Sequence, residues 1–173
     1  ITTDKNNPTV NPYGPAYAVD SGHGGLVILD PVENSTYSID IPTREPADSI
    51  RSRFPAPDPP SLWWGEEHPW GPGYNPADPH NPMLDSSGRV WMTSKIRTGA
   101  PAWCSDPAVT KFAEYFPLSR GGRQASFYEP DTGEFTLIET CYSTHHLQID
   151  TDESETVYFN ELSGSMFGWV DMK

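Results

Sequence analysis

The chain has few of the residues that mark several common protein classes. It carries 11 basic residues against 24 acidic ones, for a formal net charge of −13. It therefore lacks the basic surface that binding to nucleic acid requires. No stretch approaches 18 consecutive apolar residues, so no transmembrane helix is predicted. We expect neither a nucleic-acid partner nor insertion into a membrane.

The short motifs that identify many enzymes are also missing. The sequence contains no GxSxG nucleophile elbow, no HExxH zinc motif, no CxxC pair and no GxxxxGK[ST] phosphate loop. Assignment as a hydrolase, a zinc finger or a nucleotide-binding protein therefore has no support from motifs.

Only two cysteines are present, Cys104 and Cys141. An even pair in a tryptophan-rich chain with few lysines favours one disulfide and an oxidising compartment, the alternative being two buried free thiols. The first residue is Ile1, and no charged segment followed by an apolar run comes after it. We expect any secretion signal to have been removed, and the protein to be periplasmic or extracellular.

Aromatic residues and proline, in contrast, are abundant. Six Trp, eight Tyr and seven Phe are too many for a disordered chain, and 19 Pro with 14 Gly favour short strands and loops over long helices. We expect residues 1–15 to form an extended arm and residues 16–173 to form a β domain. A Pro/Trp-rich insertion at 42–79 interrupts this domain.

Alternation of apolar and polar residues predicts the strands. They are expected near residues 17–19, 26–29, 36–41, 124–129, 135–139, 146–150, 156–160 and 166–171, with two more on either side of a tight turn at 85–88. One short helix is predicted at 107–115. Asp106 suits its N-cap, Pro107 its first position, and Val109 and Phe112 one apolar face.

Two internal repeats organise these strands. Residues 26–39 match residues 125–137 as a strand, an acidic-Pro turn and a second strand. Likewise, His80 and Asp85 with the strand after them match His145 and Asp150 with theirs, and the second turn has two extra residues. We call the strand pair with the His and Asp residues the inner pair, and the pair with the acidic-Pro turn the outer hairpin. Their order along the chain, inner pair, outer hairpin and inner pair, is typical of four-stranded propeller blades.

Two segments resemble a known family. Residues 85–93, DSSGRVWMT, resemble the D-x-x-G-x-V-W-F-T blade signature of virginiamycin B lyase-like and NHL-type β-propellers. Residues 127–135, FYEPDTGEF, resemble the Y-D-P-x-T-G-x-F outer hairpin of the same blades. The resemblance covers residues 80–171 and 16–43. It implies a β-propeller fold and no particular catalytic residue, because the lyase's catalytic positions have no match here.

A closed propeller needs at least about four blades of roughly 40–50 residues each. The chain has 173 residues, which are enough for two to three blades. We therefore predict an all-β, incomplete β-propeller with long loop insertions and one short helix. Its partners are then the remaining blades or other copies of the protein. A closed small β-sandwich is the alternative fold.

The histidines are the main candidates for a site. His80 and His145 occupy equivalent positions, and His146 adjoins the second. If equivalent inner strands meet at the mouth of a channel, these imidazoles can together bind a divalent metal or act as acid and base. In the competing interpretation, each histidine caps its own blade by bonding to backbone.

A second set of candidates lies in and near the insertion. A ligand-binding role is predicted for Trp63, Trp64, Glu67, His68 and Arg123, because aromatic side chains stack planar or sugar ligands and the Gly-Gly pair before Arg123 allows close approach of an anion. The alternative is that the aromatic side chains pack the insertion onto its own domain.

Two functions follow from these candidates. The first is an extracytoplasmic β-propeller used as a binding or assembly module. The second is a propeller lyase or hydrolase with a divalent metal at the channel mouth. The fold alone does not choose between them, because propellers carry many activities.

Overall fold

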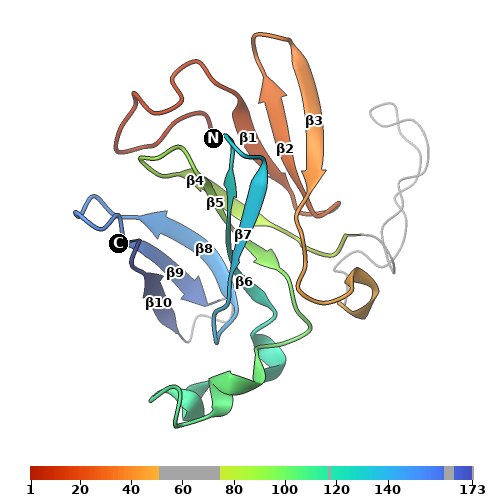
Figure 1. The fold of residues 1–173 in the computed structure, drawn as a ribbon, viewed down its shortest axis with the longest axis vertical. Helices are drawn as coiled ribbons and strands as arrows, with labels where there is room; N and C mark the ends of the chain where they lie inside the picture. The colour runs from red at the N-terminus through yellow and green to blue at the C-terminus, as the bar shows by residue number, and fades with distance from the viewer. Residues whose placement is uncertain (51–74, 117, 162–165, 173) are drawn as a thin grey trace.

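The protein is built from three small antiparallel sheets. The computed structural model describes residues 1–50, 75–116, 118–161 and 166–172, and the sheets lie side by side in chain order (Figure 1). Their strands are β1 (Ala16–Asp20), β2 (Gly25–Asp30) and β3 (Ser35–Asp40), then β4 (His80–Leu84), β5 (Val90–Lys95), β6 (Arg123–Glu129) and β7 (Glu134–Ile138), then β8 (Thr144–Ile149), β9 (Val157–Glu161) and β10 (Phe167–Val170). The all-β prediction is confirmed.

The central sheet, β4–β7, is covered on both faces. Along β5, Val90 and Met92 face the first sheet, whereas Trp91 faces the third, as the period of two in a strand requires. The first core contains Tyr17, Leu26, Ile28, Ile41, Ala77, Leu84, Val90, Met92 and Tyr128. The second contains Met83, Trp91, Ala125, Leu147, Ile149, Val157 and Phe159. Each core therefore joins two neighbouring sheets.

The outer hairpins β2–β3 and β6–β7 repeat one another in detail. Asp30 pairs with Ser35 at the turn of the first hairpin, and Glu129 pairs with Glu134 at the turn of the second. Four residues after each acidic residue, the backbone is left-handed, with φ of 49° at Asn34 and 74° at Gly133. Asn and Gly are the residues that adopt this conformation most readily, which explains the matched spacing.

The inner hairpins β4–β5 and β8–β9 also match. In the first, the carboxylate of the fully buried Asp85 accepts hydrogen bonds from the backbone N–H groups of Ser87 and Arg89 and from Nε1 of Trp91, the last at 2.8 Å. In the second, where the turn is two residues longer, Asp152 takes over this capping role and accepts from Thr156. The repeated hairpins are therefore present in the structure, but the carboxylate that caps the second turn is Asp152 and not Asp150, the residue that the sequence repeat matches with Asp85.

The predicted helix at 107–115 is wrong, since the described residues contain no α-helix. Asp106 does accept a hydrogen bond from the N–H of Ala108, as an N-cap would. The chain then makes only separate turns, because the Thr110 hydroxyl accepts from the N–H of Phe112 and interrupts the helical pattern. The described residues contain four short 3₁₀ segments, η1 (Ala47–Ser49), η2 (Ala102–Ser105), η3 (Ala113–Tyr115) and η4 (Leu118–Arg120). Of these, η3 lies within the range predicted as a helix. The apolar face predicted for this helix has no core to cover, because Val109 and Phe112 are half exposed.

The N-terminal segment, residues 1–15, folds back onto the sheets. The amino group of Ile1 donates to the carbonyl of Tyr17 at 2.5 Å, and the Ile1 side chain packs against both cores. Asp4 is buried, and Nδ2 of Asn6 reaches the carbonyl of Asp150. The segment therefore fastens the first strand to the rest of the protein. Of the insertion at 42–79, residues 51–74 lie outside the described part of the chain.

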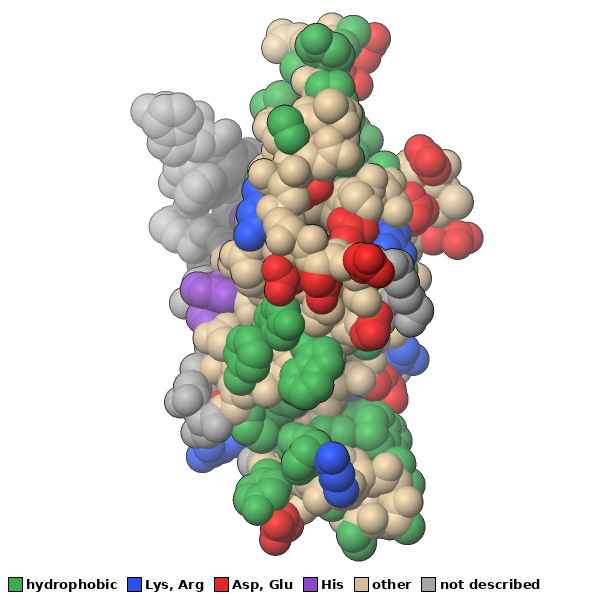
Figure 2. All heavy atoms as spheres, turned by 90° about the vertical axis from the view of Figure 1, so that its left-hand side faces the viewer, with side chains coloured by type: hydrophobic (Ala, Val, Ile, Leu, Met, Phe, Trp, Pro, Cys, Tyr) green, Lys and Arg blue, Asp and Glu red, His purple; other side chains and the backbone are tan. Residues whose placement is uncertain are grey.

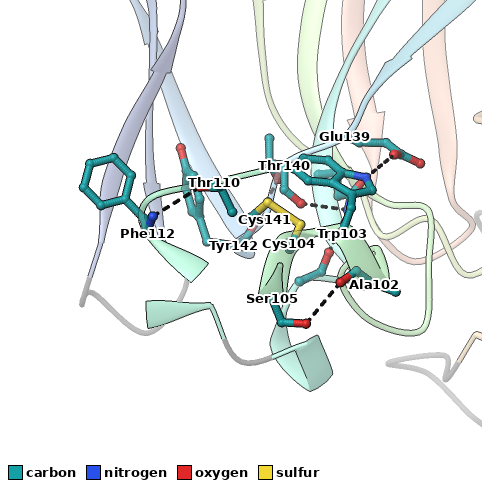
Figure 3. The surroundings of a disulfide bond; sticks show 12 residues. Ala102, Trp103, Cys104, Ser105, Thr110, Phe112, Glu139, Thr140, Cys141 and Tyr142 are labelled. Atoms are coloured by element: carbon teal, nitrogen blue, oxygen red, sulfur yellow. Dashed lines mark hydrogen bonds between the residues drawn. A yellow bond between two sulfur atoms is a disulfide. The ribbon is translucent and has the colours of Figure 1, made fainter. Parts of the chain in front are cut away.

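The disulfide between Cys104 and Cys141 is confirmed (Figure 3). It joins η2 to the segment between β7 and β8, with a Cα–Cα distance of 5.3 Å. Beside it, Nε1 of Trp103 donates to Glu139 at 3.4 Å. Burial by itself would raise the pKa of Glu139, but hydrogen bonds from Arg97 and Trp103, together with the charges of Arg97 and Arg44, outweigh it and lower this pKa. The disulfide and these contacts hold the irregular residues 102–116 against the sheets.

Substitution of Trp91 by Ala tests the two-sided packing of the central sheet. Trp91 is 1 % exposed, so we expect a loss of about 3–5 kcal/mol in the free energy of unfolding. Urea denaturation followed by circular dichroism measures this loss. Trp91→Phe, which keeps a smaller aromatic ring but removes the bond to Asp85, should lose less. Tyr13→Ala, at a side chain 88 % exposed, is the matched control. A loss below about 1 kcal/mol for Trp91→Ala would contradict the packing described here.

Candidate metal centre

Three imidazoles meet where β4, at the edge of the second sheet, lies next to β8, at the edge of the third. His80 belongs to β4, and His145 and His146 belong to β8. One potential ligand atom from each ring lies within 4.8 Å of the other two. The ring centroids of His80 and His145 are 4.8 Å apart, and those of His145 and His146 are 4.2 Å apart. The rings of His80, His145 and His146 therefore lie together, and metal binding by them stays a prediction.

A bulge in β8 explains how two consecutive histidines share one site. In a regular strand, neighbouring side chains point to opposite faces. The pairing of β8 with β9 shifts register between Thr144 and Leu147, and here the rings of His145 and His146 stack at an interplanar angle of 19°. The N–H of His146, displaced from the regular ladder, instead donates to Oδ1 of Asn160 at 2.7 Å.

A matching irregularity occurs in β4. Its pairing with β5 shifts register between His80 and Met83. Within this stretch, Asn81 has a φ of 54°, in the left-handed region that asparagine tolerates better than most residues. The Nδ2 group of Asn81 donates to the carbonyl of Leu147 at 3.3 Å. The bulged stretches of both strands therefore touch, and this contact brings the histidines of the two sheets together.

A second link between the sheets lies next to His145. The hydroxyl of Thr93, which faces His80 in the ladder of the second sheet, donates to the carbonyl of His145. Thr93 is fully buried. The backbone that carries His145 is thereby fixed relative to the strand that carries His80, so the separation of the rings is set by the fold.

A buried ion pair lies beside the histidines. The guanidinium of Arg123 donates to both the carboxylate and the backbone carbonyl of Asp78. The other carboxylate oxygen of Asp78 is 3.5 Å from Nε2 of His80. Asp78 and Arg123 are 7 % and 6 % exposed. A carboxylate at this position is a potential acceptor for the N–H of a metal-binding imidazole, which is the contact that orients such rings.

The surroundings of His145 favour the neutral form of its imidazole by lowering its pKa. Burial is the main cause of its lowered pKa, and repulsion from His146, His80 and Arg123 adds to it, whereas the charge of Asp78 partly opposes it. Neutral imidazole is the form that coordinates a metal ion. His146 is exposed and the other two rings are half buried, so the cluster is open to solvent on one side.

This arrangement has the chemistry of a first-row divalent metal site. Three imidazole nitrogens are the ligand set of several zinc centres that keep an open position for water or substrate. Each ring belongs to a strand whose position is fixed by contacts across the sheets. The described cluster contains no carboxylate ligand, which favours Zn²⁺ and similar metals over Mg²⁺ or Ca²⁺.

The other predicted site residues have different outcomes. Trp63, Trp64, Glu67 and His68 lie outside the described residues, so their role stays a prediction. Arg123 is present beside the histidines, paired with Asp78. The Gly-Gly pair before it has a packing role, because a Cβ on Gly121 would lie 2.2 Å from Cβ of Ala100, and one on Gly122 would lie 2.5 Å from the carbonyl oxygen of Arg97.

Sequence reasoning missed Asp78 and Asn160. Asp78 stands two residues before His80, and this spacing was a signal that it belongs to the site. Its pairing with Arg123, however, joins positions 45 residues apart, which the sequence does not reveal. Asn160 is recognised only through the bulge, since its bond to His146 exists because the ladder is interrupted there.

No family model, no curated protein and no solved structure matches this chain. The resemblance to propeller blades therefore depends on the residues quoted above. Within the part of the chain that the structure describes, no helix has the length and apolar character needed to cross a membrane.

The lowered pKa of His145 predicts a pH dependence of the metal-free protein. We expect its imidazole to titrate below the ordinary value of about 6.5 in NMR spectra recorded in the presence of a chelator. Because the folded state disfavours the protonated ring, the contribution of neutral His145 to stability is complete above about pH 6.5. It decreases as the pH falls from there toward the lowered pKa. A His145 pKa at or above that of an unfolded control peptide would contradict this electrostatic picture.

Proposed function

We propose that this chain forms consecutive blades of a larger β-propeller and binds a divalent transition metal where neighbouring inner strands meet. The observation that carries the proposal is the convergence of His80, His145 and His146 from matched, bulged positions on two sheets. The competing interpretation, in which each histidine only caps its own strand, does not require the rings to share a space.

The faces of the sheets support the propeller. Trp91 on the central sheet lies against Phe127, with ring centroids 4.9 Å apart, and both pack into the core shared with the third sheet. The equivalent residues of the third sheet are Tyr158 and Trp169, which are also cross-strand partners. In a propeller, this aromatic face is the one that the next blade covers.

The aromatic face of the third sheet is exposed. Trp169 and Phe167, which alternate along β10, are 66 % and 64 % exposed, and Phe167 stacks on Tyr158. Figure 2 looks at the molecule from the side where β8–β10 lie in Figure 1 and shows hydrophobic side chains gathered there. A contiguous exposed aromatic surface of this kind is typical of an interaction surface. It supports a role in assembly with further blades or with other copies of the protein.

A bound metal would add a second capability. Held by three neutral imidazoles, it supplies Lewis-acid chemistry and activates a water molecule at its open position. Asp78 would keep the His80 ring oriented, and the exposed His146 would leave one side of the site accessible. Accessibility of the site to solvent favours the second candidate function, a metal-dependent lyase or hydrolase. The confirmed disulfide agrees with the proposed periplasmic or extracellular location.

Metal binding is tested directly by titrating the chelator-treated protein with Zn²⁺ in a calorimeter. We expect one equivalent to bind, and His80→Asn and His145→Asn each to weaken binding by at least about tenfold, as loss of one ligand does. His23→Asn is the matched control, because His23 lies in the β1–β2 turn beside Asp20, apart from the cluster. Equal affinities for His80→Asn and the unchanged protein would contradict the shared site.

The assembly surface is tested by sedimentation over a range of concentrations. We expect the chain to self-associate, and the double variant Phe167→Ser/Trp169→Ser to shift it toward monomers, because exposed aromatic area drives association. Tyr13→Ser is the control, since Tyr13 is more exposed but lies in the N-terminal segment. A monomeric protein at millimolar concentration, unaffected by the double variant, would contradict the proposal.

A further inference from the structure

One asparagine of the chain lies in the acceptor pattern for N-linked glycosylation. Asn34, Ser35 and Thr36 match Asn-x-Ser/Thr, in which the middle residue is any except proline. The sequence contains one other asparagine with a hydroxyl residue two positions later, Asn7, and there the middle residue is Pro8. The pattern therefore selects Asn34 alone.

The fold places these three residues at the tip of an outer hairpin. Asn34 is the last residue of the β2–β3 turn, and Ser35 and Thr36 begin β3 (Figure 1). All three residues are exposed. Because Asn34 and Thr36 are both on the surface, a glycan attached here extends into solvent and displaces no packed side chain.

The conformation of the turn does not depend on the Asn34 amide. Oδ1 of Asp30 accepts hydrogen bonds from the N–H groups of Val32, at 2.8 Å, and of Glu33, at 3.1 Å. The turn requires of Asn34 only a left-handed backbone, with φ of 49°. A substituent on the side-chain nitrogen leaves this backbone unchanged, so the turn tolerates modification of the amide.

The repeated hairpin shows how much room this turn position has. Gly133 occupies the equivalent position of the β6–β7 turn, with φ of 74°. A Cβ added at Gly133 would have no neighbour within 4 Å among the described residues. Because the two turns have the same length and register, we expect the Asn34 side chain to project into similarly open space.

We propose that Asn34 carries an N-linked glycan when the chain passes through a secretory compartment that contains an asparagine-linked glycosyltransferase. In this transfer, the amide nitrogen attacks the anomeric carbon of a sugar carried on a lipid diphosphate. One C–N bond forms, the bond between that carbon and the diphosphate oxygen breaks, the amide proton goes to solvent, and the lipid diphosphate leaves. The disulfide between Cys104 and Cys141 fits passage through such an oxidising compartment.

The modification site is separate from the metal centre and the assembly surface proposed above. The β2–β3 hairpin belongs to the first sheet, whereas the histidines belong to the second and third sheets and Trp169 belongs to the third. The proposal therefore does not depend on metal binding or on assembly.

The test is secretion of the chain from a eukaryotic cell line behind a cleavable signal peptide, so that the secreted product is the chain itself. We expect one glycan, seen as a shift to higher mass that peptide-N-glycosidase F reverses while converting Asn34 to Asp. Asn34→Gln should abolish the shift. Asn7→Gln, the control at an exposed asparagine followed by proline, should leave the shift unchanged.

A second pair of variants separates recognition of the site from folding. Thr36→Val keeps the β-branched shape that suits β3 but removes the hydroxyl, so the glycan should be lost while the circular dichroism of the secreted protein is unchanged. Thr36→Ser keeps the hydroxyl and should retain the glycan. Secreted, folded protein without a glycan on Asn34 would overturn the proposal, as would equal glycan occupancy in Thr36→Val and the unchanged chain.

Discussion

Burial of the central sheet on both faces is the constraint on which the rest of this structure depends. Because β5 presents Val90 and Met92 to one side and Trp91 to the other, it needs an apolar sheet against each face. The Trp91 ring can be buried only because its Nε1 group donates to Asp85, a carboxylate that also closes the inner turn. The contacts of Asp85 and Trp91 thus fix the β4–β5 turn, the position of β5 and the packing of the core between the second and third sheets.

The candidate metal centre arises from an irregularity that occurs in two hairpins. A regular strand would send His145 and His146 to opposite faces, whereas the bulge stacks their rings on each other. The bulge in β4 turns Asn81 toward β8, where its side chain bonds to the backbone. Two neighbouring sheets of the same design can therefore form a site that one sheet alone does not, and this is why the matched positions of His80 and His145 in the sequence were informative.

The sequence predicted what depends on local spacing or on repetition. The hairpin turns and the matched positions of His80 and His145 follow from patterns within or between repeats, and the disulfide was predicted because the chain contains only two cysteines. The helix at 107–115 failed because a good N-cap cannot sustain a helix whose apolar face lacks a core to cover. The bulges and the Asp78–Arg123 ion pair depend on contacts between distant segments, which spacing alone does not predict.

The ion pair of Asp78 and Arg123 determines the electrostatic surroundings of the candidate metal centre. Asp78 precedes β4 and Arg123 begins β6, so the pair joins two strands of the central sheet that are not neighbours in it. Both residues are buried, and salt therefore screens their charges little. The charge of Arg123 contributes to lowering the pKa of His145, and the charge of Asp78 acts in the opposite direction. Loss of either partner would unbalance the charges beside the imidazoles, so the same pair that joins distant strands also balances the field at the histidine cluster.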